Sequence, residues 1–220
     1  MSFSPLPKTF LEELHHPRHD TIVELGCGDG AFSELLTATG ARIIGCDRRP
    51  PWHGSCAQLV ADVRQLPFPP ASIDLLVCAN LLRQIWPMTD GCPVPVDWYR
   101  CLRENGRLFI FEDDAAGATP AVRNYRDLQA FLVRLDPARR RPLLSRRVFA
   151  TSLKSGATRP GRWDLGWQQN NWTVNIDQVL ALLSALDPEG QGEGGRLTRA
   201  IRQEGMSYGR YWWACWTPED

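Results

Sequence analysis

The chain lacks the features that would assign it at once to a membrane, secreted or strongly charged class. No apolar run approaches the roughly 18 residues of a membrane-spanning helix. Residues 1–20 contain no signal-peptide core. Lys plus Arg and Asp plus Glu both number 25, so there is no net charge to attract nucleic acid or anionic lipid. We therefore expect a cytoplasmic protein without a membrane partner.

Cysteine pairs and metal-ligand clusters are also missing. The seven cysteines form no C-x-x-C pair, their number is odd, and most lie in apolar, strand-like runs. This pattern predicts buried free thiols in a reducing compartment. His15, His16 and His19 have no fourth ligand at a metal-binding spacing, so we expect a helix end there and no metal site.

The composition is that of an ordinary globular protein, with 43% hydrophobic and 23% charged residues in a chain of 220. This size predicts a single domain over residues 1–220 with a substantial core. In its first half, short apolar segments alternate with helical stretches, which predicts a parallel, doubly wound α/β sheet. The expected strands there are residues 22–25, 42–46, 58–61, 73–79 and 107–112, with a turn at 104–106 before the last one. The expected helices are residues 10–16, 32–39 and 95–103.

Two further regions have distinct patterns. The link at residues 48–56 is short and holds two prolines, so an irregular connection is expected instead of a regular helix. After residue 114, both helical and strand patterns occur. The helices are expected at residues 120–135, 176–186 and 197–204, the strands at 163–174 and 208–217, and a glycine-rich surface loop at 190–195.

Residues 21–31 form the most informative stretch. An apolar strand ends in three alternating glycines, Gly26, Gly28 and Gly30, and an amphipathic run follows. A strand, a glycine turn and a helix make room for a nucleotide-like ligand at the carboxyl edge of an α/β sheet, because side chains would keep the ligand away from the backbone. Glu24 lies two residues before the first glycine. Its carboxylate suits a cationic ligand better than a pyrophosphate, which it would repel.

The glycine pattern alone leaves two ligands open. Gly26, Gly28 and Ala31 also satisfy the dinucleotide pattern G-x-G-x-x-G/A, and Asp47 lies where a ribose-binding acid is expected. A nicotinamide-dependent oxidoreductase is therefore one rival interpretation.

Polar residues at the ends of the next strands bear on this choice. Asp47, Asp62 and Asn80 each end an expected strand. Because parallel strands share one direction, these side chains should project at the same edge of the sheet as the glycine turn. Such a set suits an adenosine that carries a positively charged amino-acid tail.

With these residues the chain resembles class I S-adenosylmethionine-dependent methyltransferases, nearest to the small-molecule type of that superfamily. The resemblance covers residues 20–113 and implies a seven-stranded, mostly parallel α/β sheet with an antiparallel last strand. It also implies S-adenosyl-L-methionine as cofactor and S-adenosyl-L-homocysteine as product. The dinucleotide alternative gives no reason for Glu24 or for the Leu-Pro-Phe that follows Asp62. The matching segments are Glu24-Leu-Gly-Cys-Gly-Asp-Gly30, Gly45-Cys-Asp47, Ala61-Asp-Val-Arg-Gln-Leu-Pro-Phe68, Asp74-Leu-Leu-Val-Cys-Ala-Asn80 and Leu102-Arg-Glu-Asn-Gly-Arg-Leu-Phe-Ile-Phe-Glu112.

The resemblance implies a role for each matching position. Glu24 and the glycine turn would lie beside the methionine part of the cofactor, and Asp47 would accept hydrogen bonds from the ribose hydroxyls. Asp62 and the Val63 backbone would face the adenine, and Asn80 would line the wall near the sulfonium. The implied cofactor-binding set is Glu24, Gly26, Cys27, Gly28, Gly30, Asp47, Asp62, Val63 and Asn80.

No catalytic residue is identified from the sequence. The sulfonium is already activated, so in-line positioning of the acceptor can carry the reaction. Relatives often have a His pair after the position of Asn80. Here Leu82-Arg83-Gln84 stands there, which removes one candidate base. Residues 112–114 (Glu-Asp-Asp) either supply a base or simply begin a solvated loop. Arg83 either holds an anionic acceptor or makes a surface ion pair.

The acceptor is expected to be a small molecule, with RNA or protein as the alternative. The segment 120–162 has eleven basic residues and two acidic ones, so its arginines could track RNA phosphates or could form a solvated surface. No Asn-Pro-Pro-Tyr and no Pro-Cys follows the strand at 73–79, which disfavours amino methylation and cysteine-dependent C5 methylation of bases.

The second half of the chain is expected to shape the acceptor site. Residues 114–205 would form this acceptor-side region, and residues 206–220 would form the last strand. The candidates for lining the site are Trp167, Gln168, Asn170, Asn171 and Trp172. A non-catalytic module that binds S-adenosylmethionine and acts through a partner is a rival of another class. The sequence carries no feature that specifies an oligomeric state.

Overall fold

The computed structural model describes most of the chain, with gaps in several loops and at the N-terminus. The described residues are 10, 12, 14, 20–49, 55–86, 94–114, 117–137, 140–155, 160–169 and 174–219. Phe10, Glu12 and Leu14 are helical, as expected for the N-terminal segment. The histidines at 15, 16 and 19 and most of the 48–56 link lie outside the described residues.

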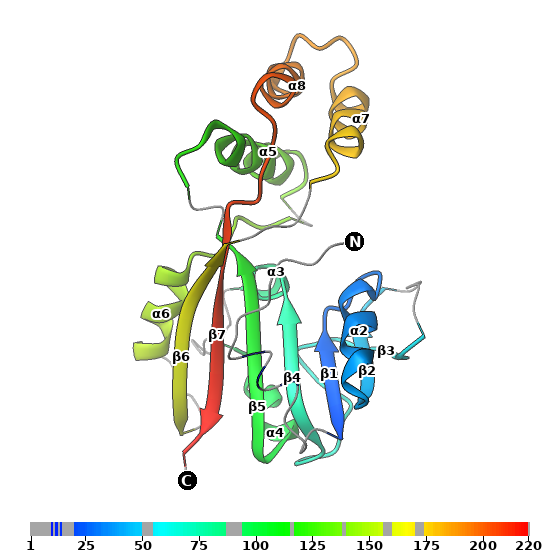
Figure 1. The fold of residues 1–220 in the computed structure, drawn as a ribbon, viewed down its shortest axis with the longest axis vertical. Coiled ribbons are helices and arrows are strands. Elements are labelled where there is room, and N and C mark those ends of the chain that lie inside the picture. Colours follow the sequence, from blue (N-terminus) through cyan, green and yellow to red (C-terminus); the bar gives the residue numbers. More distant parts are fainter. Residues whose placement is uncertain are drawn as a thin grey trace. The chain divides into compact units, whose positions relative to one another are not determined.

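A seven-stranded sheet organises the chain, in the order β3-β2-β1-β4-β5-β7-β6 (Figure 1). β2 pairs with both β1 and β3, and β4 pairs with both β1 and β5, all in parallel. The strands are β1 (Thr21–Leu25), β2 (Arg42–Asp47), β3 (Ala57–Val60), β4 (Ile73–Ala79), β5 (Leu102–Asp113), β6 (Gly161–Gln169) and β7 (Arg210–Pro218).

β7 runs antiparallel to its neighbours. The amide of Asp114, which follows β5, donates to the carbonyl of Arg210, where β7 begins. At the other end of β7, the Thr217 hydroxyl donates to the carbonyl of Arg162, near the start of β6. The strand order and directions confirm the predicted fold class, an α/β sheet that is mostly parallel with an antiparallel last strand.

The topology reverses between β1 and β4. The chain proceeds outward from β1 to β2 and β3, and then returns to place β4 on the other side of β1. Ligands of open α/β sheets bind beyond the carboxyl ends of the strands at such a switch point. β1 and β4 are almost completely buried, which explains why both are nearly continuous apolar runs.

Helices connect the strands and differ in part from the predictions. α2 (Ala31–Leu36) and the short 3-10 helix Thr37–Thr39 follow β1, and α4 (Val96–Cys101) precedes β5, both close to expectation. α3 (Leu82–Ile85) and α6 (Arg146–Ser155) were not predicted. α3 has only four residues, which is too short for a periodic pattern to be recognised.

β5 is longer at its start than the predicted strand over residues 107–112. Leu102 already pairs with Ile73, and Arg107 pairs with Leu75, so the register shifts between these two pairs. Gly106 lies in this irregular stretch, where a Cβ atom would come within 3.0 Å of the Ile73 carbonyl oxygen. The predicted turn at 104–106 is therefore a bulge inside a strand, and its glycine allows the close approach.

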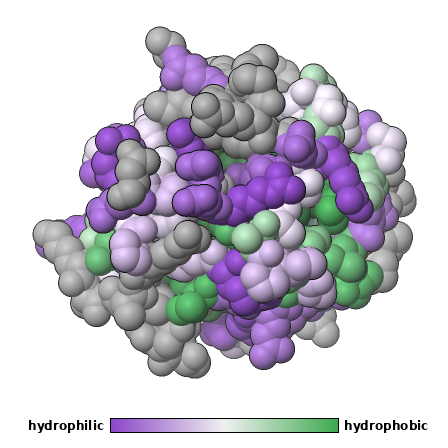
Figure 2. Space-filling model, turned by 90° about the horizontal axis from the view of Figure 1, so that it is seen from below, coloured by the Kyte–Doolittle hydropathy of each residue, from purple (hydrophilic) through white to green (hydrophobic). Residues whose placement is uncertain are grey.

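Charged side chains close the amino edge of the parallel strands. The buried Asp74 carboxylate accepts hydrogen bonds from the amides of Asp20 and Thr21, at 3.2 and 2.9 Å. Arg103 Nη1 lies 2.7 Å from Asp74 Oδ1 and 3.9 Å from Asp20 Oδ2. Figure 2 views the molecule from this end of β1, β4 and β5 and shows hydrophilic residues over much of the centre, with apolar residues in smaller patches.

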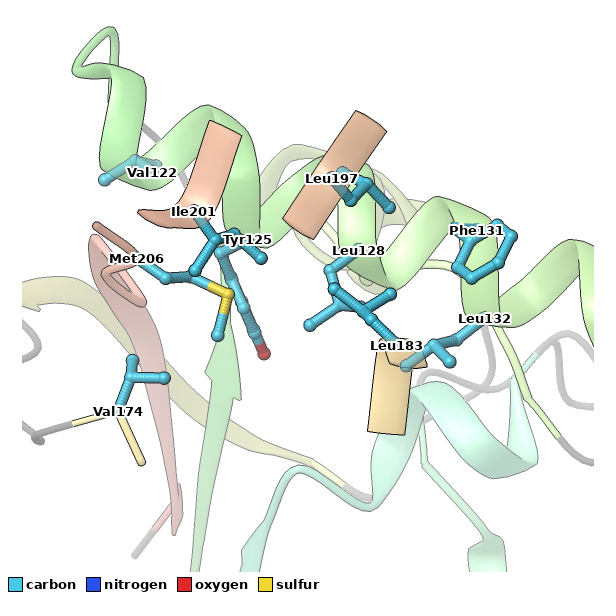
Figure 3. Close-up of a cluster of buried hydrophobic side chains, with 10 residues drawn as sticks. All are labelled: Val122, Tyr125, Leu128, Phe131, Leu132, Val174, Leu183, Leu197, Ile201 and Met206. Atoms are coloured by element: carbon cyan, nitrogen blue, oxygen red, sulfur yellow. The ribbon is translucent and has the colours of Figure 1, made fainter. Parts of the chain in front are cut away.

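The residues group into two compact units. One contains β1–β5, α2–α4, α6 and most of β6 and β7, and the other contains α5 (Pro120–Leu135), α7 (Ile176–Leu186) and α8 (Glu193–Glu204). The helical unit has its own apolar core (Figure 3), in which Leu128 and Leu132 of α5 lie with Leu183 of α7 and Leu197 of α8. The prediction of a single folding domain over 1–220 stays a prediction.

The start of α8 corrects the predicted glycine-rich surface loop. Gly194 and Gly195 are buried in the first turn of the helix, and the Asp187 carboxylate accepts the Gly195 amide at 2.7 Å. A Cβ on Gly195 would come within 1.9 Å of the Gly190 carbonyl oxygen. Gly194 and Gly195 allow the α7–α8 connection to pack closely against α8. The glycines of this stretch therefore reflect tight packing and not exposure to solvent.

The basic segment 120–162 does not belong to one unit. Residues up to 144 lie in the helical unit, and residues from 145 lie with the sheet. The described residues of the helical unit carry nine arginines and nine acidic residues. An example is Arg134 of α5, which forms an ion pair with Glu193 of α8. Within the helical unit, the positive charge of the described residues of 120–144 is therefore balanced by acids from other parts of the sequence.

The six described cysteines are free thiols, five of them buried, as predicted. Cys92 lies outside the described residues. None of the described helices has the length and apolar character needed to cross a membrane.

Candidate functional site

The glycine turn after β1 is held against β2. The amides of Gly26 and Cys27 both donate to the Cys46 carbonyl, at 2.7 and 3.2 Å. Gly26 has φ +71° and packs on Leu81, whose Cδ1 would lie 2.7 Å from a Cβ atom. Gly28 has φ +54°, but nothing lies within 4 Å of the position of its Cβ. The turn is thus packed on one side and leaves room for a ligand close to the backbone at Gly28.

Glu24 lies beneath this turn. Its side chain is buried, with 3% of the residue exposed, and the Ser33 hydroxyl of α2 donates to it. Burial raises the pKa of Glu24 to about 8, although the Ser33 hydrogen bond acts in the opposite direction. The carboxyl is therefore largely protonated at neutral pH, and a cation placed beside it would favour the ionised form.

Asp47 connects the end of β2 with the glycine turn. Its Oδ2 atom accepts the Gly28 amide at 3.0 Å, and its Oδ1 atom accepts the Arg49 amide at 3.1 Å. The Ala61 amide donates to the Asp47 carbonyl, which brings the end of β3 alongside. The side chain of Asp47 is only half-buried, so it remains accessible to a ligand.

The three acids influence the same pair of cysteines. Burial, followed by the nearby Glu24 and Asp47, raises the pKa of Cys27 to about 12. Burial, followed by Asp47 and Asp62, raises the pKa of Cys46 to about 11. Asp47 is thus close to both thiols, with Glu24 near Cys27 and Asp62 near Cys46, and the two thiols are inert packing groups.

Asp62 and Val63 begin the loop after β3. The Asp62 side chain is 45% exposed and accepts the Arg64 amide at 2.9 Å. Val63 is buried, and its carbonyl accepts the indole N–H of Trp98 at 2.6 Å. The Val63 carbonyl is thus engaged from the protein side.

Two residues of α4 fix the rest of this loop, and sequence reasoning missed them. Asp97 Oδ2 accepts the Leu66 amide at 2.6 Å, and Arg100 donates from Nη2 to the Leu66 carbonyl and from Nη1 to the Phe68 carbonyl, both at 2.8 Å. Asp97 and Arg100 also pair with each other, and the hydrogen bond from Arg100 lowers the pKa of Asp97. The available signal was an acid and an arginine three residues apart on a helix, which usually indicates only a surface pair.

Asn80 ends β4 in an unusual backbone conformation. Its φ is +55°, in the left-handed region, which Asn tolerates better than most residues. The Asn80 amide donates to the Phe111 carbonyl at 2.8 Å, and the chain then turns into Leu81 and α3. Leu81 contacts Gly26, so the end of β4 lies beside the glycine turn.

The acids at the end of β5 do not form a solvated loop start, and that prediction is wrong. Glu112 and Asp113 are buried, with 1% and 5% of each residue exposed, and Asp114 is half-buried. Glu112 Oε1 accepts the amides of Leu82 and Arg83 at 2.5 and 3.4 Å, so it caps α3. The sequence could not reveal this role, because the amides that donate to Glu112 belong to the segment that follows β4.

The predicted acceptor-side candidates lie partly outside the described residues, namely Asn170, Asn171 and Trp172. Trp167 is 46% exposed and stacks under the Arg210 guanidinium, whose Cζ atom lies 4.8 Å from the ring centroid. Gln168 is half-buried. No group of three described residues has the side chains and spacing needed to hold a metal ion.

The residues present fit S-adenosylmethionine at the ends of β1, β2 and β3. Gly28 is open to close approach, Asp47 is accessible beside it, and the buried Glu24 would gain an ionic partner from an ammonium group. This donor set is acidic, whereas a pyrophosphate requires N–H donors or basic side chains.

Comparisons with known proteins agree with this assignment. Residues 23–110 match the family described as "Methyltransferase domain". No curated protein matches the chain at a significant level. A structure described as a methyltransferase from an antibiotic biosynthesis pathway of Anabaena variabilis is 13% identical, with a TM-score of 0.61 and 94% of each chain covered.

Two other structures share the fold. The Haloferax volcanii methyltransferase in complex with the Trm112 methyltransferase activator is 15% identical, with a TM-score of 0.57 and coverage of 96% of this chain and 89% of that one. Geranyl diphosphate C-methyltransferase from Streptomyces coelicolor, with S-adenosyl-L-homocysteine bound, is 12% identical, with a TM-score of 0.50 and coverage of 96% and 76%. Residues 23–110 of the chain thus match a methyltransferase domain, and the chain has the fold of these solved methyltransferase structures.

Proposed function

We propose that this enzyme transfers a methyl group from S-adenosylmethionine to a small molecule and that the cofactor lies over the glycine turn. The observation that carries the proposal is the hydrogen bond between Asp47 and the Gly28 amide. It places an accessible carboxylate beside the part of the backbone that is open to a ligand. The ends of β1 and β2 therefore offer a ribose-binding acid and a side-chain-free surface together.

Each predicted residue then has a physical task. Glu24, oriented by Ser33, stabilises the ammonium of the methionine part, and Asp47 accepts hydrogen bonds from the ribose hydroxyls. Asp62 and the Val63 backbone face the adenine, in an orientation that Trp98 fixes through the Val63 carbonyl. Gly26, Cys27, Gly28 and Gly30 form the floor, and Asn80 forms the wall at the end of β4.

Positioning carries the chemistry in this proposal. S-adenosylmethionine, when bound, supplies a methyl group on a cationic sulfur. The protein would contribute by holding the cofactor over the glycine turn and by orienting the acceptor toward that methyl group, which is catalysis by positioning. We assign no catalytic base, and we give Glu112 the structural role of holding the first amides of α3 through its Oε1 atom.

Two observations favour a small-molecule acceptor over RNA or protein. The helical unit that contains the first part of the basic segment has equal numbers of described basic and acidic residues. Two of the structural neighbours are described as acting in antibiotic biosynthesis and on geranyl diphosphate. One neighbour forms a complex with a methyltransferase activator. RNA and protein are therefore included as alternative acceptors in the test below. The free cysteines are consistent with a cytoplasmic location, which we also propose.

The test follows the labelled methyl group. The protein is incubated with a cell extract and S-adenosylmethionine labelled in the methyl group, and the label is sorted into small molecules, RNA and protein. The proposal predicts label in the small-molecule fraction, and much less of it with the Asp47→Ala variant when the S-adenosylmethionine concentration is below the wild-type dissociation constant. Label confined to RNA or protein would overturn the small-molecule part. Binding of S-adenosylhomocysteine with no labelled product would support the non-catalytic module.

A further inference from the structure

Arg83 of α3 carries a guanidinium that forms no ion pair with any described residue of the protein. Its Nε and Nη1 atoms are shielded from solvent and make no hydrogen bond. The ion pairs between described residues include none from Arg83. A surface ion pair, one of the two roles that the sequence left open, is therefore absent among these residues.

An arginine in this state requires an explanation. A guanidinium carries five N–H donors and stays charged at every accessible pH, so shielding it from water without partners is costly. Most buried donors in proteins are paired, and the exceptions often belong to functional sites. Glu112, whose Oε1 atom accepts the backbone amides of Leu82 and Arg83, forms no ion pair with the Arg83 guanidinium.

The position of Arg83 points to the acceptor and not to the cofactor. Arg83 lies three residues after Asn80, at the carboxyl edge of β4, and Leu81 between them contacts Gly26 of the glycine turn. The acidic groups proposed to hold the cofactor, Glu24, Asp47 and Asp62, lie at or just after the ends of β1, β2 and β3, which are all on the side of β4 away from β5. Arg83 therefore stands beside the methyl-donor site, next to the wall formed by Asn80.

We infer that Arg83 binds an oxyanion, a carboxylate or a phosphate, carried by the acceptor of the methyl group. This inference rests on the proposed function and adds the chemical class of the acceptor. The planar guanidinium can hold two oxygens of either anion through parallel N–H bonds, which also orients the molecule for in-line attack. A neutral or cationic acceptor would leave the shielded Nε and Nη1 donors without a partner.

Four proteins form the test: the wild type, Arg83→Gln, Arg83→Lys and the control Arg42→Gln. Arg42 is an exposed arginine at the start of β2, at the opposite edge of the sheet. Each protein is incubated with labelled S-adenosylmethionine and the small-molecule fraction of a cell extract, and the product is passed over an anion exchanger. The affinity for S-adenosylhomocysteine is measured in parallel by calorimetry.

The inference predicts that the labelled product is retained by the exchanger. Arg83→Gln should reduce its formation at least about tenfold, Arg83→Lys less, and Arg42→Gln not at all, with an unchanged affinity for S-adenosylhomocysteine. Phosphatase treatment separates the two anions, because a phosphate product loses its retention and a carboxylate product keeps it. Either result supports the inference.

Stability provides an independent readout. A structural arginine would lower the Tm when it is removed, whereas an arginine shielded without a partner should leave the Tm of Arg83→Gln unchanged or raised. Labelled product that passes through the exchanger, or an unchanged rate with Arg83→Gln, would overturn the inference and leave the proposed function intact. Failure of the wild type to bind S-adenosylhomocysteine would overturn both.

Discussion

The two edges of the parallel sheet differ in how their polar groups are satisfied. At the amino edge, Asp74 is buried and its two oxygens are shared by Arg103 and the amides of Asp20 and Thr21. At the carboxyl edge, Gly28 is open and Arg83 has shielded donors without partners. Both edges carry charges, but only one has capacity left for a ligand. Satisfied charges indicate structure, and unsatisfied charges beside open backbone indicate function.

The largest effect on stability is expected at the amino edge. Asp74→Ala removes the partner of Arg103 and leaves two backbone amides without an acceptor, so the free energy of unfolding should fall by about 3 kcal/mol. Urea unfolding measures this loss. The affinity for S-adenosylhomocysteine, measured well below the Tm, should stay unchanged. A large loss of affinity with little loss of stability would contradict the assignment of a structural role to the amino edge.

Asp47→Ala should show the opposite behaviour at the carboxyl edge. The ribose hydroxyls would lose a charged acceptor, which corresponds to about 2 kcal/mol, or about 30-fold in the dissociation constant of S-adenosylhomocysteine. The free energy of unfolding should change by less than about 1 kcal/mol, because Asp47 is only half-buried. Calorimetric titration and urea unfolding of the same preparation measure the two quantities. Unchanged affinity would remove Asp47 from the site.

Glu24 should make stability depend on pH. Its pKa is raised to about 8 in the folded protein, so the folded state holds a proton that the unfolded state has already lost. The free energy of unfolding should therefore decrease as pH rises, by about 2 kcal/mol between about pH 6 and about pH 8. In Glu24→Gln this decrease should be absent. A wild-type curve that is flat, or that rises over this range, would mean that the pKa of Glu24 is not raised.

The same group should couple pH to cofactor binding. An ammonium beside Glu24 favours the carboxylate, so S-adenosylhomocysteine should release a proton when it binds near neutral pH. Calorimetry in buffers with different ionisation enthalpies measures this release. Glu24→Gln should abolish it.

The smallest effect is expected at the adenine side. Trp98→Phe keeps most of the packing but loses the hydrogen bond to the Val63 carbonyl, which should cost about 1 kcal/mol of stability. The looser loop should weaken the binding of S-adenosylhomocysteine by roughly threefold to fivefold. Thermal unfolding and calorimetry measure both. Arg64→Gln, an exposed change in the same loop, serves as the matched control and should have no measurable effect on stability.

Local patterns predicted that the glycine turn and the acid ending β2 meet at one edge of the sheet, and the structure brings them together. β1, its glycines and the acid that ends β2 are neighbours in sequence or stand at the same end of parallel strands, so strand direction alone brings them together. Other contacts join segments that are distant in the sequence. Glu112 caps α3 because β5 lies beside β4. Arg134 forms an ion pair with Glu193 because α5 packs on α8. No pattern within a window of the sequence contains such pairings.

The most direct measurement of the central claim is a calorimetric titration of the wild-type protein with S-adenosylhomocysteine, NAD and NADP. The acids that gather around the Gly28 turn predict one binding site for S-adenosylhomocysteine and none for either nicotinamide cofactor. Binding of NAD or NADP, with no heat from S-adenosylhomocysteine, would contradict the assignment of this edge of the sheet to the methyl donor.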